Sequence, residues 1–582
     1  MSLSEISEIP VSQKIWSLPD PVPDHEIHTL AAETGISKVL ARLLAQRGIK
    51  SKEEALAFLN PSAAQLHNPF LMDGMEQAVQ RIATAVNSEQ KIMIYGDYDV
   101  DGTTAVALMM RALTPVFGNH VSFYIPDRYK EGYGISNEGI EHAASLGCSL
   151  IIALDCGIRS SDKVEFAKTK NIDFIICDHH LPGETIPDAA AVLDPKKPGC
   201  QYPYKELSGA AIGFKLLQAL FKRGILNSDP SEYLDLVALS IGADIVEMKG
   251  ENRVLAHLGL AIINQGKSPA INKMLLGAEK DTQSPSAKAA GISDLVFKAA
   301  PLINAAGRIQ HGSLAVEFLM STSPEELNSL YSRLIDLNKK RSNLDKQITD
   351  EALLMIRSSD VLRSAASTVL FHKEWHKGVV GIVASRVIEK YYRPTIILTE
   401  SNGKITGSAR SVKGFDIHNA IAKCASLLLQ YGGHQAAAGL TLLPENLNQF
   451  RVMFEQVVSD TLQPISKTEE VSADLELQPA DMSFELYKEL MKLAPFGPGN
   501  MTPVFIAKGL TDSGWAKIVG TTHLKMKLGE PGSPFLDAIA FGQAHHYDAI
   551  SGSIPVDACY TLDENHWNGK VNLQMLVKDI RH

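Results

Sequence analysis

Short apolar segments alternate with helical segments over residues 92–177, and this alternation limits the possible folds of the chain more than any other feature. The apolar runs Ile92–Tyr95, Val121–Ile125, Leu150–Leu154 and Ile172–Cys177 have the length of strands, and helix-like segments separate them. Alternation at this interval indicates right-handed βαβ units, which build a parallel sheet covered on both faces. The sequence therefore predicts an α/β fold with a parallel sheet in this region.

Three carboxylates follow the first of these strands within five positions. Asp97, Asp99 and Asp101 lie in the stretch Gly96-Asp-Tyr-Asp-Val-Asp-Gly102. Like charges this close repel one another unless a cation lies among them, and carboxylate oxygens suit magnesium or manganese better than zinc. An Asp-Gly turn with one aspartate capping the following helix explains the same residues. The motif alone leaves both interpretations open.

Two further strands of the predicted sheet end in residues that bind metals. Asp155 follows the third strand, and Asp178, His179 and His180 follow the fourth. Ligands of open parallel sheets bind beyond the carboxyl ends of the strands, so we expect these side chains to meet the first acidic motif. Asp244, in an apolar stretch further along, would be costly to bury unless it is paired or bound to a metal. Clusters at three strand ends favour a functional metal site over chance.

Length, charge and cysteine usage limit the class of protein. The 582 residues are too many for one core, so several domains are expected. No apolar run is long enough to predict a transmembrane helix, and the acidic N-terminus lacks the layout of a signal peptide. Six scattered cysteines without a CxxC pair favour a reducing cytoplasm over a disulfide framework or a structural zinc site. The net charge of −10 disfavours a surface coated in basic residues but permits a local basic groove.

The rest of the chain divides into parts of different pattern. Many charged residues around a narrow apolar stripe predict one long, mostly exposed helix over residues 324–357, and the stripe ends too soon for the alternative, a coiled coil. A smaller strand–helix domain is expected over 358–465, and short strands with one helix over 466–582 suit an OB-like β-barrel. Residues 1–65 predict a helical N-terminal extension, which leaves 66–323 to the domain of the parallel sheet.

These motifs together resemble those of the DHH phosphoesterase superfamily, and other segments resemble the RecJ single-strand-specific exonucleases within it. The resemblance covers nearly the whole chain beyond about residue 65, in the order of the family. Ser240-Ile-Gly-Ala-Asp244 replaces the more usual Gly-Thr-Ile-Ala-Asp, but the aspartate keeps its place. The additional segments are Asp127–Ile135, Leu207–Ala210, Gly250–Arg253, Asn304–Ile309, Trp375–Ile382, Gly407–Ser411, Gly432–Gly439, Pro495–Asn500 and Trp567–Gly569.

The resemblance implies a parallel-sheet DHH domain, a smaller α/β DHHA1 domain joined to it by the long helix, and a C-terminal OB-like barrel. It also implies two divalent metal ions, Mn²⁺ or Mg²⁺, with Asp155 bridging them and His180 on the scissile phosphate. The catalytic residues would be Asp99, Asp101, Asp155 and His180. The implied metal ligands are Asp97, Asp99, Asp101, Asp155, His179 and Asp244.

The DHHA1 domain would bind the substrate. From the residues alone, the glycine-rich segment Gly432–Gly439 is better explained by close helix packing, and the resemblance reverses this reading toward contact with phosphate. Ser408 and Arg410 lie two apart on a probable strand, so both would face a terminal 5′ phosphate. The expected substrate-binding residues are Arg128, Arg308, Ser408, Arg410, Gly432, Gly433 and His434. In the barrel, the candidates for stacking and binding a single strand are Trp515, Lys517, Lys525, Lys527 and Trp567.

The implied function is a 5′→3′ exonuclease that degrades single-stranded DNA to 5′-mononucleotides in recombination and repair. The expected partners are single-stranded DNA, a single-strand-binding protein and a helicase. We expect no association with a membrane. The protein is expected to be a cytoplasmic monomer. One alternative is a DHH phosphodiesterase for short oligonucleotides or cyclic dinucleotides, or a pyrophosphatase, which the length and the barrel disfavour. The other is a catalytically inactive replication scaffold, which the intact ligand positions disfavour.

Overall fold

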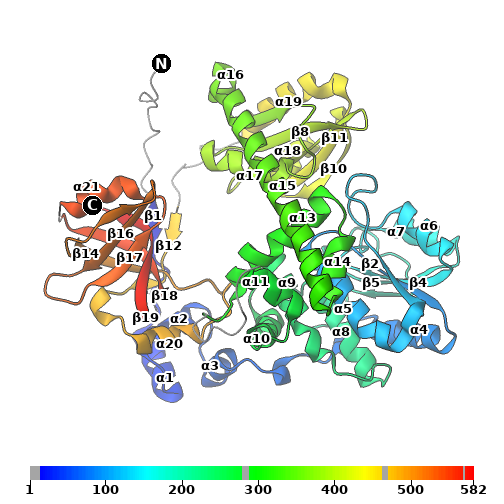
Figure 1. Ribbon diagram of the computed structural model, residues 1–582, viewed down its shortest axis with the longest axis horizontal. Helices are drawn as coiled ribbons and strands as arrows, with labels where there is room; N and C mark the ends of the chain where they lie inside the picture. The colour runs from blue at the N-terminus through cyan, green and yellow to red at the C-terminus, as the bar shows by residue number, and fades with distance from the viewer. Residues whose placement is uncertain (1–13, 278–287, 462–469, 553, 568–569) are drawn as a thin grey trace.

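The computed structural model of the chain describes residues 14–277, 288–461, 470–552, 554–567 and 570–582 (Figure 1). Within these ranges the strands form a five-stranded parallel sheet, a five-stranded mixed sheet, a seven-stranded sheet and one isolated pair. The long helix α15 (Pro324–Arg357) runs from the parallel sheet to the mixed sheet, and the seven-stranded sheet lies to one side of both. Among the helices of the described ranges, none combines the length and the apolar character that crossing a membrane requires.

The parallel sheet has the order β3-β2-β4-β5-β6, and each pair of neighbours is parallel. Alternate residues of each strand enter different cores: Ile92 and Ile94 pack with helices α5 and α8, whereas Met93 and Tyr95 pack with α6 and α7. This confirms the predicted α/β fold with a sheet covered on both faces. The strands are β2 (Lys91–Gly96), β3 (Val121–Tyr124), β4 (Cys148–Leu154), β5 (Asp173–Cys177) and β6 (Ala191–Leu193), and the helices α5 (Val100–Phe117), α6 (Asn137–Ser145), α7 (Ser161–Lys168) and α8 (Gly209–Lys222).

Helix α15 joins two cores through its two halves. Leu327, Leu330 and Leu334 of the first half pack into the core of the parallel-sheet domain, while Ile348 and Ala352 of the second half pack against the mixed-sheet domain. Its bounds are those that the charge and apolar pattern predicts. The middle of the helix is mostly exposed, and α15 connects the two domains as one continuous helix.

The mixed sheet has the order β10-β11-β9-β8-β7 and carries helix α17 (Val380–Lys390). The glycine-rich segment forms an antiparallel hairpin in this sheet, in which Gly432 pairs with Gly439 and Gly433 with Ala438. The alternative of helix packing through small residues is therefore wrong: the segment is a hairpin of two strands, in which Gly432 and Gly433 are exposed and Ala438 is buried in the core of this domain. The strands are β7 (Thr368–Phe371), β8 (Thr395–Ser401), β9 (Lys404–Arg410), β10 (Leu428–His434) and β11 (Ala437–Leu442).

The C-terminal sheet closes into a ring. Strand β14 pairs with β18 on one side and with β16 on the other, which joins the two ends of the run β14-β18-β19-β17-β16 and confirms the OB-like barrel. The side chain of Trp567 and residues 568–569 lie outside the described residues. The strands are β13 (Leu475–Glu476), β14 (Phe505–Asp512), β15 (Lys517–Val519), β16 (His523–Gly529), β17 (Leu536–Ala540), β18 (Val556–Trp567) and β19 (Lys570–Arg581).

The described part of the N-terminal segment packs on the barrel. Strand β1 (Ile15–Ser17) pairs with β12 (Glu470–Ser472), and Leu30, Leu40 and Leu44 share one hydrophobic core with the barrel residues. Helices α1 (Asp24–Thr34), α2 (Lys38–Gln46) and α3 (Lys52–Leu59) supply this packing. Helices α1 to α3 and the C-terminal barrel are therefore parts of one folded unit.

Candidate metal centre and substrate cavity

Four strands of the parallel sheet each end in an aspartate at the same edge. Asp97 follows β2, Asp155 follows β4, Asp178 follows β5 and Asp194 follows β6, and all four are buried. Asp155 has a φ of 59°, a conformation that residues other than glycine rarely adopt and that is concentrated at functional sites. Parallel strands thus bring together carboxylates that lie about 100 residues apart, as predicted from the strand-end rule.

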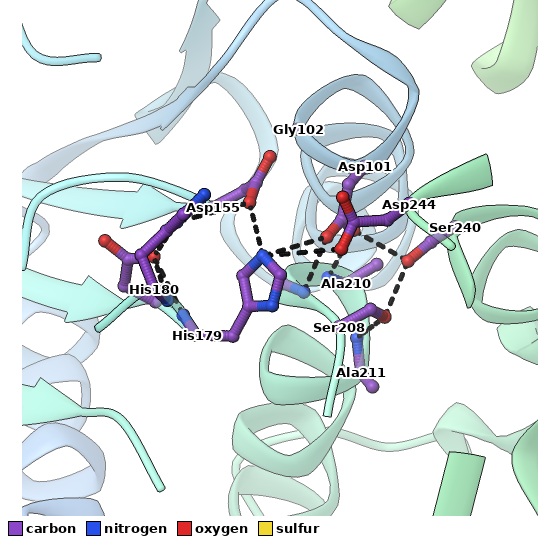
Figure 2. A network of polar contacts seen from close by, with 12 residues as sticks. Asp101, Gly102, Asp155, His179, His180, Ser208, Ala210, Ala211, Ser240 and Asp244 are labelled. Atoms are coloured by element: carbon purple, nitrogen blue, oxygen red, sulfur yellow. Dashed lines mark hydrogen bonds and ion pairs between the residues drawn. The ribbon is translucent and has the colours of Figure 1, made fainter. Parts of the chain in front are cut away.

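Asp101 is held by the N-terminus of α8. Its carboxylate accepts hydrogen bonds from the backbone nitrogens of Gly209 at 2.7 Å and Ala210 at 2.9 Å, and from the hydroxyl of Ser240 at 2.6 Å (Figure 2). Unsatisfied backbone N–H groups and the dipole at a helix N-terminus favour a negative charge there. Ser240 contacts Ser208 at 2.6 Å in turn, so the carboxylate has a fixed orientation.

His179 lies at the centre of the acidic cluster. Its Nε2 is 3.1 Å from Asp155, 3.6 Å from Asp244 and 3.7 Å from Asp101, and Figure 2 shows these carboxylates on two sides of the ring. Two sets of three ligand atoms lie within 4.8 Å of one another: Asp155, His179 and His180 form one set, and Asp101, His179 and Asp244 form the other. This arrangement of oxygens and imidazole nitrogens suits two neighbouring divalent ions.

The other two carboxylates of the first motif, Asp97 and Asp99, belong to neither of these two sets. Asp99 is the N-cap of α5 and accepts a hydrogen bond of 3.1 Å from the backbone nitrogen of Gly102, so the turn interpretation and the metal interpretation both apply to this segment. Asp97 accepts a hydrogen bond of 3.4 Å from Gly134 through one oxygen. Its other oxygen is buried and has no hydrogen-bond partner within the described residues, so a cation bound beside it would satisfy this oxygen.

The carboxylates of this centre destabilise one another's charge. Burial, followed by the charges of Asp101 and Asp99, raises the pKa of Asp155 well above its usual value. Burial and the charge of Asp99 do the same for Asp97, and burial with Asp101 raises the pKa of Asp244 to about 8. Bound cations would reverse these shifts, so the residues present fit a site for divalent metal ions.

Asp178 orients His180 and is not itself part of either ligand set. Burial alone would raise the pKa of Asp178, but the hydrogen bond and charge of His180 and the backbone nitrogen of Ile158 hold it at about 2. The carboxylate accepts hydrogen bonds from the Nδ1 of His180 at 2.7 Å and from Ile158 at 2.9 Å. Because Nδ1 is engaged in this way, the Nε2 of His180 is the ring nitrogen left for other contacts.

A cavity of about 780 Å³ begins at Asp178 and His180 and extends to the mixed sheet. Its walls come from the strand-end loops of the parallel-sheet domain, from α13 (Ala300–Ile309) and from strands β9, β10 and β11. Every substrate-binding residue that the resemblance implies lines this one cavity. They are Arg128, Arg308, Ser408, Arg410, Gly432, Gly433 and His434.

Cations gather at the end of the cavity that lies toward the mixed sheet. Burial, followed by the charges of Arg128 and Arg410, lowers the pKa of Arg308 to about 10. Burial and the charge of Arg128 also lower the pKa values of Arg410 and Lys377. Arg410 donates a hydrogen bond of 2.8 Å to Ser408, which fixes its guanidinium group. Several cations that disfavour one another's charge suit a bound anion such as phosphate.

Sequence reasoning missed several residues of the cavity and its surroundings. Tyr98, Tyr133, Arg159 and Lys377 line the cavity, but only contacts between distant segments place them there. The segment Asp127–Ile135, which contains Tyr133, was one of the motifs that carried the family resemblance. It did not indicate which residue the side chain of Tyr133 contacts.

The barrel carries a separate group of aromatic and basic residues. The ring of Trp515 is partly exposed, and the ammonium groups of Lys517, Lys525 and Lys527 lie 4.2, 5.6 and 5.5 Å from its centroid. An aromatic ring surrounded by cations suits base stacking beside a phosphate backbone. These four of the five predicted barrel residues therefore lie together.

Comparison with known protein families places three domains along the chain. The DHH family N-terminal domain matches residues 91–241, the DHHA1 domain matches residues 363–460, and the RecJ OB domain matches residues 473–579. These ranges correspond to the parallel-sheet domain, the mixed-sheet domain and the barrel.

Relatives and solved structures match nearly the whole chain. The single-stranded-DNA-specific exonuclease RecJ of Bacillus subtilis is 35% identical over 98% of this chain and 71% of its own length. The RecJ of Escherichia coli is 34% identical over 93% of this chain and 95% of its own length. A crystal structure of RecJ from Thermus thermophilus in complex with Mn²⁺ superposes with a TM-score of 0.81, at 27% identity over 98% of this chain and 79% of that chain. The metal-capable centre, the three matched domains and these identities show that the chain belongs to the RecJ family of the DHH superfamily.

Proposed function

We infer that this chain is a metal-dependent 5′→3′ exonuclease that degrades single-stranded DNA to 5′-mononucleotides. One observation carries this inference: a single cavity joins His180, at the acidic centre, to the cations Arg128, Arg308 and Arg410. A centre that suits divalent ions, next to a cluster that suits phosphate, is the arrangement that phosphodiester hydrolysis requires. The family names of the relatives, single-stranded-DNA-specific exonucleases, supply the substrate.

The acidic centre would hold two divalent ions, Mn²⁺ or Mg²⁺. When bound, such ions lower the pKa of water and neutralise charge on phosphoryl oxygens. Helix α8 and Ser240 hold Asp101 in place for this role, and Asp178 holds His180 so that Nε2 reaches the scissile phosphate. The proposed ligands are Asp97, Asp99, Asp101, Asp155, His179 and Asp244.

The cationic end of the cavity would bind the 5′ phosphate of the strand. Ser408 and Arg410 lie on β9 and share a hydrogen bond, which supports binding of one anion by both side chains. With the terminal phosphate held there and the next phosphodiester at His180, each cleavage releases one nucleotide. The barrel, with Trp515 and its lysines, would hold the strand further from its end.

We propose further that the enzyme acts in the cytoplasm as a monomer, in DNA recombination and repair. All six cysteines are buried and free, as expected for a reducing compartment. A single-strand-binding protein and a helicase are the proposed protein partners, because both supply the single strand that the cavity accepts. Gel filtration with light scattering tests the monomer, and pull-down with each purified partner tests the contacts.

A single assay tests the activity and its substrate. The protein is incubated with Mn²⁺ and 5′-phosphorylated single-stranded DNA, duplex DNA, a cyclic dinucleotide or pyrophosphate, beside an Asp155→Ala control. Release of mononucleotides from the single strand alone, lost in Asp155→Ala, is the expected result. Equal activity of the control would contradict the metal mechanism, and hydrolysis of pyrophosphate alone would contradict the substrate.

A further inference from the structure

Tyr133 lies in the cavity against His180, and the proposed mechanism gives it no part. Its hydroxyl is 3.2 Å from Nε2 of His180 and 3.5 Å from the backbone oxygen of Asp155. The rings of Tyr133 and His180 meet edge to face with centroids 6.1 Å apart, and Tyr98 meets Tyr133 in the same manner at 6.2 Å. The hydroxyl therefore occupies the position that faces the only free nitrogen of this histidine.

Contacts to the acidic centre hold the loop that carries Tyr133. The backbone nitrogen of Gly134 donates to Asp97 at 3.4 Å, and its carbonyl accepts a hydrogen bond of 3.0 Å from Tyr95. On the other side, the carboxylate of Glu131 accepts hydrogen bonds from residues before and after the loop. The position of Tyr133 is thus fixed by the same elements that build the metal centre.

The glycines on each side of Tyr133 allow the loop to follow this path. Gly132 and Gly134 have φ values of 92° and 79°, which side chains of L-residues rarely adopt. Tyr133 is 57% exposed and lines the cavity, so a bound strand can reach its side chain.

The hydrogen bond from His180 to Asp178 determines which ring nitrogen of His180 faces Tyr133. Because Nδ1 donates to Asp178 at 2.7 Å, Nε2 of His180 faces the hydroxyl of Tyr133. The phenol hydroxyl and Nε2, 3.2 Å apart, are close enough to contact one phosphoryl group.

We propose that Tyr133 is a further catalytic residue, which donates a hydrogen bond to a non-bridging oxygen of the scissile phosphate beside His180. In the free enzyme its hydroxyl contacts Nε2 of His180, and in the substrate complex the phenol hydrogen is directed to the phosphate. Charge on the non-bridging oxygens changes during phosphoryl transfer, so a fixed donor there stabilises the transition state. Tyr133 transfers no proton and acts only as a donor. This inference rests on the proposed function.

Kinetics of Tyr133→Phe test the hydroxyl while the ring and the loop stay in place. We expect kcat on single-stranded DNA to fall by about 100-fold, the lower end of the range for loss of one such donor, with KM changed less than about threefold. Tyr392→Phe removes a hydroxyl at the surface and should leave both constants unchanged. Wild-type kcat in Tyr133→Phe would overturn the proposal, because a purely structural ring is retained in this variant.

Phosphorothioate DNA separates a contact to the phosphate from an indirect effect. Sulfur is a weak hydrogen-bond acceptor, so replacing the contacted oxygen removes the same interaction as Tyr133→Phe does. With one diastereomer at the first linkage, the penalty of the variant should shrink to less than about threefold, whereas the other diastereomer keeps it. Equal penalties in both diastereomers would contradict the contact. A wild-type enzyme inactive on single-stranded DNA would contradict the proposed function instead.

Discussion

Ser240 donates a hydrogen bond of 2.6 Å to the carboxylate of Asp101. We predict that Ser240→Ala weakens Mn²⁺ binding by about 10- to 100-fold, because partners that orient a ligand contribute this much to metal affinity. Titration calorimetry of the purified variant measures it. Ser332→Ala, an exposed change on α15, should bind Mn²⁺ like the wild type, and equal affinity of both variants would exclude the orienting role.

Gly209 permits α8 to approach Asp155 closely. A Cβ at this position would lie 2.7 Å from the Cβ of Asp155 and 3.1 Å from the Oδ2 of Asp101. We expect Gly209→Ala to displace these carboxylates and to lower kcat by about 100-fold or more, since displacements near 1 Å have this cost. Gly213→Ala, one turn further along α8, is the matched control because its Cβ meets Leu154 at an ordinary 3.4 Å. Similar losses in both variants would indicate a general effect on the helix.

The strand-end rule predicted the acidic centre well, because the geometry of a parallel sheet follows from the alternation of strands and helices. Asp97, Asp155 and Asp178 meet for this reason. The rule does not predict contacts that depend on how helices pack, so it did not identify Ser240 as the partner of Asp101.

Other features depend on segments that no local pattern connects. The core of the barrel contains Leu40 and Tyr560, which lie more than 500 positions apart, so the sequence indicated a separate N-terminal extension. The hairpin at Gly432 was not predicted for the same reason. Glycines are compatible with helix packing and with strands, and only the pairing with β11 distinguishes these two structures. Tyr133 was visible within a motif, yet its contact with His180 is a tertiary one.

Arg410 provides a test of the phosphate end of the cavity. We predict that the wild type has a lower KM for 5′-phosphorylated than for 5′-hydroxyl single-stranded DNA, and that Arg410→Ala removes most of this difference. A charge-assisted hydrogen bond contributes about 1.5–3 kcal/mol, which corresponds to a change of about 10- to 100-fold in KM. Arg223→Ala alters an exposed ion pair with Glu76 and should keep the preference. A preference that survives in Arg410→Ala would place the 5′ phosphate elsewhere.

Asp194 makes the stability of the protein depend on pH. Burial raises its pKa from 3.8 to about 7, while the backbone nitrogen of Lys196 opposes the shift. The folded state therefore binds more protons than the unfolded state between about pH 4 and 7, so this contribution to stability is full below pH 4 and is lost as the pH rises through 7. Asp194→Asn should raise the melting temperature at pH 8 and flatten its fall between pH 5 and 8, whereas the exposed Asp20→Asn should change neither. An unaltered slope in Asp194→Asn would refute this assignment.

Substitution of Trp515 tests whether the barrel binds the strand beyond the cavity. Loss of one stacked base costs about 1–3 kcal/mol, so Trp515→Ala should raise KM for long single strands by about 5- to 100-fold. Oligonucleotides too short to span from the cavity to the barrel should show no change, and they serve as the internal control. Charge reversal at Lys525, whose ammonium lies 5.6 Å from the ring centroid, should reduce the salt dependence of KM for long strands. Equal effects of Trp515→Ala on short and long strands would mean that the substitution acts through the active site and not through the barrel.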